Sequence, residues 1–128
     1  MISGVSKVVI DVEDQDRARQ FWTSSMGFDL VVDVTFGDER WLEVRSPDGG
    51  VILILGRTSV GPGDQTAVRR ELPTSNVMFY CQDIEATYRE LTDRGVTFPL
   101  PPERQDFGWW SLFADTEGNR FALSTRDS

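Results

Sequence analysis

Hydrophobic and polar residues follow two different periods along this chain, and the periods mark a strand followed by a helix. Residues 7–12 are mostly apolar, and after the acidic cap residue Asp14 the apolar residues recur three and four positions apart as far as Gly27. A period of two indicates a strand, and spacings of three and four indicate a helix buried along one side. Further strands are predicted at residues 28–36, 40–46 and 51–57, where the tight turn SPDGG separates the last two.

The second half of the chain repeats this order. The segment that begins at Ser75 aligns without gaps with the segment that begins at Ser6, an offset of 69 residues. Asp83 takes the place of Asp14, and either side chain can accept backbone N–H bonds that the first helical turn leaves free. The remaining strands are predicted at residues 96–100, 109–114 and 120–126.

These patterns predict a single domain, residues 1–128, built from two modules. Module one covers about residues 4–56 and module two about residues 74–126, each with a strand, a helix and three strands. Residues 57–73 are rich in Gly, Pro and charged side chains, which is typical of a linker.

The amino-acid composition of the chain limits the molecules that it can be expected to bind. The net charge of −8 and the pI of about 4.4 argue against binding of nucleic acid or of an anionic membrane. The sequence shows neither a signal peptide nor an apolar run long enough to span a membrane, so we expect a cytoplasmic protein. Cys81 is the single cysteine and is expected to be a buried, inert thiol. The chain has no histidine, the commonest general base and metal ligand.

Three segments resemble the glyoxalase/bleomycin resistance protein/dioxygenase superfamily, also called the vicinal oxygen chelate superfamily. They are VVIDVEDQDRARQFWTSSMGF, NVMFYCQDIEATYRELTDRGV and FADTEGNRFAL. The resemblance implies an α+β fold in which two tandem βαβββ modules form a curved, open mixed sheet around a cleft, with the helices outside. It also implies a homodimer.

Enzymes of this family hold a divalent metal ion in the cleft, and the resemblance places its ligand positions on Lys7, Asn76, Ala122 and Leu53. A protonated lysine has no lone pair to donate, Ala and Leu have no donor atom, and Asn is a weak ligand. We therefore expect no bound metal and no other cofactor. A displaced site at Asp11 and Glu43 would suit only hard, weakly held ions.

Alternation along the strands predicts which side chains face the cleft. Lys7, Val9 and Asp11 would face it, while Val8 and Ile10 would face the helix. Either of two adjacent tryptophans in the second module could line it, because neighbouring residues of a strand point to opposite faces. The predicted ligand-contacting residues are Lys7, Val9, Trp41, Leu53, Asn76, Met78, Tyr80, Trp109, Trp110 and Ala122.

Lys7 has three possible roles in such a cleft. It could pair with a carboxylate or phosphate of a ligand. It could form a Schiff base with a carbonyl, although no second element of that mechanism is visible. It could instead pair with Asp11 or Glu43 and fill the space of the metal.

The preferred function is a metal-free protein that sequesters a small organic ligand, for example an aromatic, antibiotic-like molecule. One alternative is a lyase, isomerase or dioxygenase of the same superfamily, either dependent on a divalent metal or cofactor-free. Another is a non-catalytic protein-interaction module. A hydrolase triad is excluded because the serines have no histidine partner.

Overall fold

The computed structural model describes residues 1–57 and 77–125, and the chain divides into two compact units between residues 59 and 60. The predicted linker, residues 57–73, lies outside the described residues except for its first position. Within the described ranges, no helix is long and apolar enough to cross a membrane.

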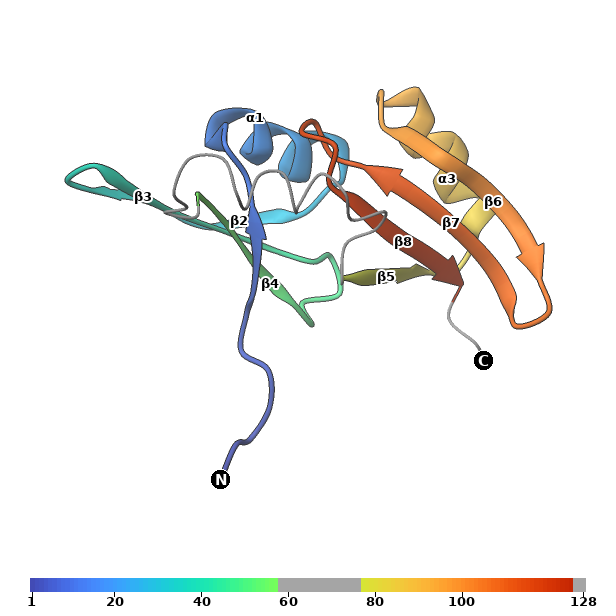
Figure 1. The fold of residues 1–128 in the computed structure, drawn as a ribbon, viewed down its shortest axis with the longest axis horizontal. Coiled ribbons are helices and arrows are strands. Elements are labelled where there is room, and N and C mark those ends of the chain that lie inside the picture. The colour runs from blue at the N-terminus through green and yellow to red at the C-terminus, as the bar shows by residue number, and fades with distance from the viewer. Residues whose placement is uncertain (58–76, 126–128) are drawn as a thin grey trace, which may run out of the picture. The chain divides into compact units, whose positions relative to one another are not determined.

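The first module has one helical segment and four strands (Figure 1). Its elements are β1 (Val8–Asp11), α1 (Gln15–Gln20), η1 (Phe21–Ser25), β2 (Asp29–Phe36), β3 (Glu39–Arg45) and β4 (Ile52–Gly56). The strand order is β1-β4-β3-β2, with β1 parallel to β4 and the other neighbours antiparallel. Lys7 therefore lies directly before the first strand and not within it.

The second module has the same topology. Its elements are β5 (Met78–Cys81), α3 (Ile84–Asp93), β6 (Thr97–Gln105), β7 (Gly108–Ala114) and β8 (Arg120–Thr125). The order is β5-β8-β7-β6, with β5 parallel to β8. The predicted α+β class with two βαβββ modules is confirmed, and each module forms its own four-stranded mixed sheet. The strand expected at residues 96–100 continues to Gln105 because β6 is an edge strand, which tolerates its three prolines.

The helices begin and end where the sequence indicates. Each of the cap residues Asp14 and Asp83 accepts a hydrogen bond of 3.0 Å from the backbone N–H three residues later. Gly27 and Gly95 follow the helices with φ of 79° and 92°, a left-handed conformation that glycine adopts without a steric penalty. The first helix departs from expectation in one respect: it widens into the π-helix η1, where the Met26 N–H bonds to the carbonyl five residues back.

One face of each sheet packs against the helix of its own module. In the first module this face and the helix bury Ile10, Trp22, Leu42, Val44, Leu53 and Leu55, and in the second Ile84, Leu91, Phe113, Phe121 and Leu123. We call this side the helix-facing side and the opposite side the open face. Burial of these apolar side chains is the main stabilising term for each module.

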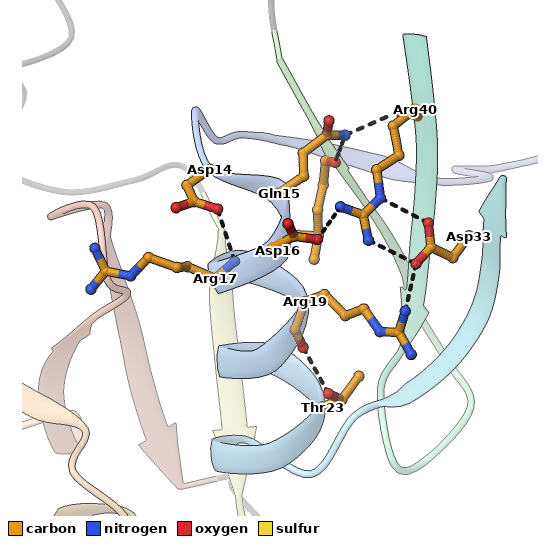
Figure 2. Close-up of polar contacts among 9 residues, drawn as sticks. Asp14, Gln15, Asp16, Arg17, Arg19, Thr23, Asp33 and Arg40 are labelled. Atoms are coloured by element: carbon orange, nitrogen blue, oxygen red, sulfur yellow. Dashed lines mark hydrogen bonds and ion pairs between the residues drawn. The ribbon is translucent and has the colours of Figure 1, made fainter. Parts of the chain in front are cut away.

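An ion-pair network fastens α1 to the β2–β3 hairpin (Figure 2). The Arg40 guanidinium donates from Nε and Nη2 to the two carboxylate oxygens of Asp33, each at 2.8 Å. Its Nη1 donates to Asp16 on α1, and Arg19 on the same helix donates to Asp33 at 2.6 Å. The Gln15 amide also donates to backbone carbonyls of β3 and β4. These bonds hold the hairpin and the helix in one fixed arrangement.

Replacing Asp33 should weaken this arrangement. We expect Asp33→Ala to lower the free energy of unfolding by about 1–3 kcal/mol, because both arginines lose their shared acceptor in a partly buried place. Urea unfolding of both proteins would measure the change. Glu90→Ala, which breaks the exposed Arg94–Glu90 pair, is the control and should cost less than about 0.5 kcal/mol. Equal losses in the two variants would contradict a structural role for the network.

Candidate ligand-binding site

The register of the first sheet decides which residues reach its open face. Val9 lies beside Ile54, and Ile54 lies beside Glu43. Paired residues of neighbouring strands point to the same side, so these three share the open face. Leu53 instead pairs with Val8 and is fully buried on the helix-facing side. The metal-ligand position that we expected at Leu53 therefore corresponds to Ile54, one residue later. Leu53 packs in the core.

In the second sheet, most of the predicted residues share the open face. Met78 pairs with Ala122 and Tyr80 pairs with Ser124 across the parallel strands. Trp110 pairs with Ser124 from the other side and so belongs to the same face. Asn76 lies outside the described residues.

The two adjacent tryptophans point to opposite sides of β7. Trp109 lies on the side of the buried Phe113, opposite Arg104, whose guanidinium carbon is 6.0 Å from the ring centre. Trp110 lies on the open face, with the ring of Phe107 at 5.9 Å. The structure thus brings Trp110, and not Trp109, together with the open-face residues of its module.

Lys7, Trp41 and Glu43 form one hydrogen-bonded group on the open face of the first sheet. The Lys7 Nζ and the Trp41 Nε1 each donate to the same oxygen, Oε2 of Glu43, at 2.7 Å. Glu43 is only 3% exposed, whereas the Lys7 side chain is 37% exposed and Trp41 is 45% exposed. Of the partners considered for Lys7, Glu43 is the one bonded to it.

The electrostatics of this group favour the ionised form of Glu43. The hydrogen bond from Lys7 lowers the pKa of Glu43 below its usual value; burial opposes that shift, and the hydrogen bond from Trp41 adds to it. The carboxylate therefore stays negative at neutral pH, and it compensates the charge of Lys7.

The described residues that we expect at the family's metal positions do not fit a divalent ion. Lys7 presents a cation that is already paired with Glu43, and neither Ile54 nor Ala122 has a donor atom. Among residues 1–57 and 77–125, no three His, Cys, Asp or Glu side chains are grouped so that they could hold a metal.

Cys81 takes no part in the open face of the second sheet. It follows Tyr80 on β5 and so points to the helix-facing side, where its thiol lies 3.7 Å from the carbonyl oxygen of Ser124. Burial raises the pKa of the Cys81 thiol, which disfavours the nucleophilic thiolate.

Sequence reasoning missed Ile54 altogether and treated Glu43 only as a partner for Lys7 or a weak metal ligand. The available signal was parity: Trp41 and Glu43 are two residues apart on one predicted strand and must share a face. That signal does not show which face the two residues share. The pairing of β3 with β4 decides that they lie on the open face.

The register of β4, which places Leu53 in the core and Ile54 on the open face, can be tested by truncating each residue in turn. We expect Leu53→Ala to lower the free energy of unfolding by about 2–5 kcal/mol, because it leaves a cavity in the core. Ile54→Ala should cost clearly less, because Ile54 is only partly buried on the open face. Urea unfolding measures both, and a larger loss for Ile54→Ala would show that the register is wrong.

The state of Glu43 predicts a dependence of stability on pH. Since its pKa is lowered in the folded state, the stability it contributes is present above its unfolded pKa, near 4.5. That contribution is lost as the pH falls through the lower, folded value. In Lys7→Met the carboxylate stays buried without its cation, so its pKa should rise and the stability that Glu43 loses on acidification should become smaller. Carboxyl-carbon NMR titration of Glu43 measures the shift, with Lys7→Arg as the charge-retaining control. Unchanged titration in Lys7→Met would contradict the ion pair.

Comparison with known proteins agrees with this architecture. The family model described as Glyoxalase/Bleomycin resistance protein/Dioxygenase superfamily matches residues 4–123. The uncharacterized protein YetH of Bacillus subtilis (strain 168) is 34% identical over 124 residues, which cover 96% of this chain and 98% of YetH.

Two crystal structures resemble the whole chain. UcmS2 superimposes with a TM-score of 0.85 at 33% identity, covering 98% of this chain and 100% of UcmS2. TnmS3, an antibiotic binding protein from Streptomyces sp. CB03234, superimposes with a TM-score of 0.79 at 26% identity, covering 98% of each chain. The family match over residues 4–123, together with two βαβββ modules, shows that this chain belongs to the glyoxalase/bleomycin resistance protein/dioxygenase superfamily.

Proposed function

We propose that this protein binds a small organic molecule at the open faces of its sheets and does so without a metal ion. The observation that carries the proposal is the Lys7–Glu43 ion pair. The family resemblance places Lys7 where the first metal ligand would be, and its Nζ lies 2.7 Å from Oε2 of Glu43. An ammonium held there repels a divalent cation and supplies no lone pair.

Exposed apolar and aromatic side chains support an organic ligand. Val9 and Trp41 on the first open face are 58% and 45% exposed, and Met78 on the second is 61% exposed. Large apolar side chains that remain exposed on one sheet face are typical of a surface that binds a ligand or a partner. TnmS3 is a binder of antibiotics, which supports a sequestering role for this relative as well.

The proposal includes the homodimer that the family resemblance implies. It gives no role to a metal-dependent lyase, isomerase or dioxygenase mechanism, since the open-face residues supply neither the ligands nor a histidine base.

Two measurements on the purified full chain test the proposal. After exposure to manganese, zinc, nickel and iron, elemental mass spectrometry should find far less than one metal ion per chain. Screening with aromatic compounds of positive, zero and negative charge should shift the indole N–H signals of Trp41 and Trp110 in ¹H–¹⁵N NMR spectra. The signals of Trp22 and Trp109, which lie on the helix-facing sides, serve as internal controls.

The outcomes separate the hypotheses. Stoichiometric metal would overturn the metal-free part and favour an enzyme. Failure of every compound to shift the two indole signals, with no metal bound, would leave small-molecule binding without support and favour a protein partner.

A further inference from the structure

The two modules carry different residues at one equivalent place on their open faces. Glu43 pairs with Ile54 as Leu112 pairs with Ala122, and a tryptophan stands two residues before each of them. The chain offset is also the same, since 112 − 43 = 69. The second module shows that this sheet accepts an apolar residue there.

A carboxylate at this place has an energetic cost that the fold itself does not require. Taking a charged group out of water is unfavourable, and an ion pair regains that energy only with good hydrogen-bond geometry. Glu43 is almost completely buried and remains ionised next to Lys7. Such a residue, where leucine suffices in the sister module, indicates a role beyond packing.

In this group, Lys7 and Trp41 are accessible to a ligand and Glu43 is buried. Lys7 Nζ and Trp41 Nε1 both lie 2.7 Å from one oxygen of Glu43, so they are at most twice that distance apart. Their side chains are over one third exposed, while that of Glu43 is 4% exposed. A molecule on this face would therefore contact the indole ring and the ammonium. An ammonium has three N–H donors, and one is given to Glu43.

The charge of this face disfavours a carboxylate as the ligand's polar group. An anion that reached Lys7 would also approach the buried charge of Glu43, and like charges a few ångströms apart repel strongly outside bulk water. Among the described residues, two cations and four anions lie on the open face of the first sheet: Lys7, Arg45, Asp11, Asp29, Glu39 and Glu43. No net positive charge is left over for an anion.

We propose that Glu43 determines ligand specificity: through Lys7 and Trp41, it selects a planar conjugated molecule with an uncharged oxygen acceptor at its edge and rejects the corresponding carboxylate. This inference rests on the proposed function and adds the chemical class of the ligand. Trp41 provides the stacking surface, Lys7 donates to the oxygen, and Glu43 is a positioning residue that also neutralises Lys7.

Three naphthalene probes of similar shape test the selection: 2-acetylnaphthalene, 2-naphthoate and 2-ethylnaphthalene. Dissociation constants are measured with the full chain from the shift of the Trp41 indole N–H signal. We expect 2-acetylnaphthalene to bind at least about tenfold more tightly than either of the others, the effect of one hydrogen bond to a charged donor. In Lys7→Met its affinity should fall to that of 2-ethylnaphthalene, whose own affinity should not change.

Variants of Glu43 test its part directly. In Glu43→Gln the Lys7 charge loses its counterion, so 2-naphthoate should bind about tenfold more tightly than to the wild type. Glu43→Leu copies the second module and provides a second variant with the same expected direction if Glu43→Gln folds poorly. Glu90→Gln changes the net charge equally on the exposed surface of α3 and should leave all three affinities unchanged.

Equal affinity of the wild type for 2-acetylnaphthalene and 2-ethylnaphthalene would overturn the role of Lys7 as donor. An unchanged affinity for 2-naphthoate in both Glu43 variants would overturn the selectivity assigned to Glu43. If none of the three probes binds, this ligand class is wrong; the wider compound screen then decides independently whether the protein binds small molecules at all.

Discussion

The parallel pairing of the first strand with the last strand is the constraint on which each module depends. It joins β1 to β4 in one module and β5 to β8 in the other, and each pairing sets a register for the rest of the sheet. Because side chains alternate, a register fixes at once which residues form the core and which reach the open face. Leu53 and Ile54 are adjacent in sequence, yet this rule gives one of them to the core and the other to the candidate site.

The helix-facing side and the open face use polar groups in different ways. On the helix-facing side Asp33, Arg40, Asp16 and Arg19 form a balanced network, and each ion pair joins one element to another. On the open face Glu43 gathers two donors onto one oxygen while both donors remain exposed. The network on the helix-facing side stabilises the packing of α1 against the β2–β3 hairpin. The arrangement on the open face leaves donor capacity and an aromatic surface directed away from the core.

Local signals in the sequence were sufficient for the elements of the fold. Asp14 and Asp83 mark helix starts because a carboxylate at that position satisfies free N–H groups, and Gly27 and Gly95 mark helix ends because they adopt positive φ. These effects act within a few residues, so one chain suffices to read them. The repeat at an offset of 69 then gave the order of the elements in both modules.

The site was less predictable because it depends on contacts between distant residues. Strand pairing makes Ile54 the equivalent of Ala122, an offset of 68 residues in place of the 69 that holds earlier in the modules. A shift of one residue reverses the face. Trp109 and Trp110 could not be distinguished until β7 was paired with β8. The partner of Lys7 is 36 residues away, and both acidic candidates satisfied the same parity rule.

The internal repeat makes each module a reference for the other, which separates what the fold requires from what the site adds. Trp41 and Trp110 occupy the same place in both modules, so an aromatic residue there belongs to the shared plan. Glu43 and Leu112 differ, and Lys7 comes with the module that has the carboxylate. The ammonium and the carboxylate are best understood as one unit: the buried carboxylate alone would be a poorly solvated charge, and together they leave a neutral, hydrogen-bonding edge beside an indole ring.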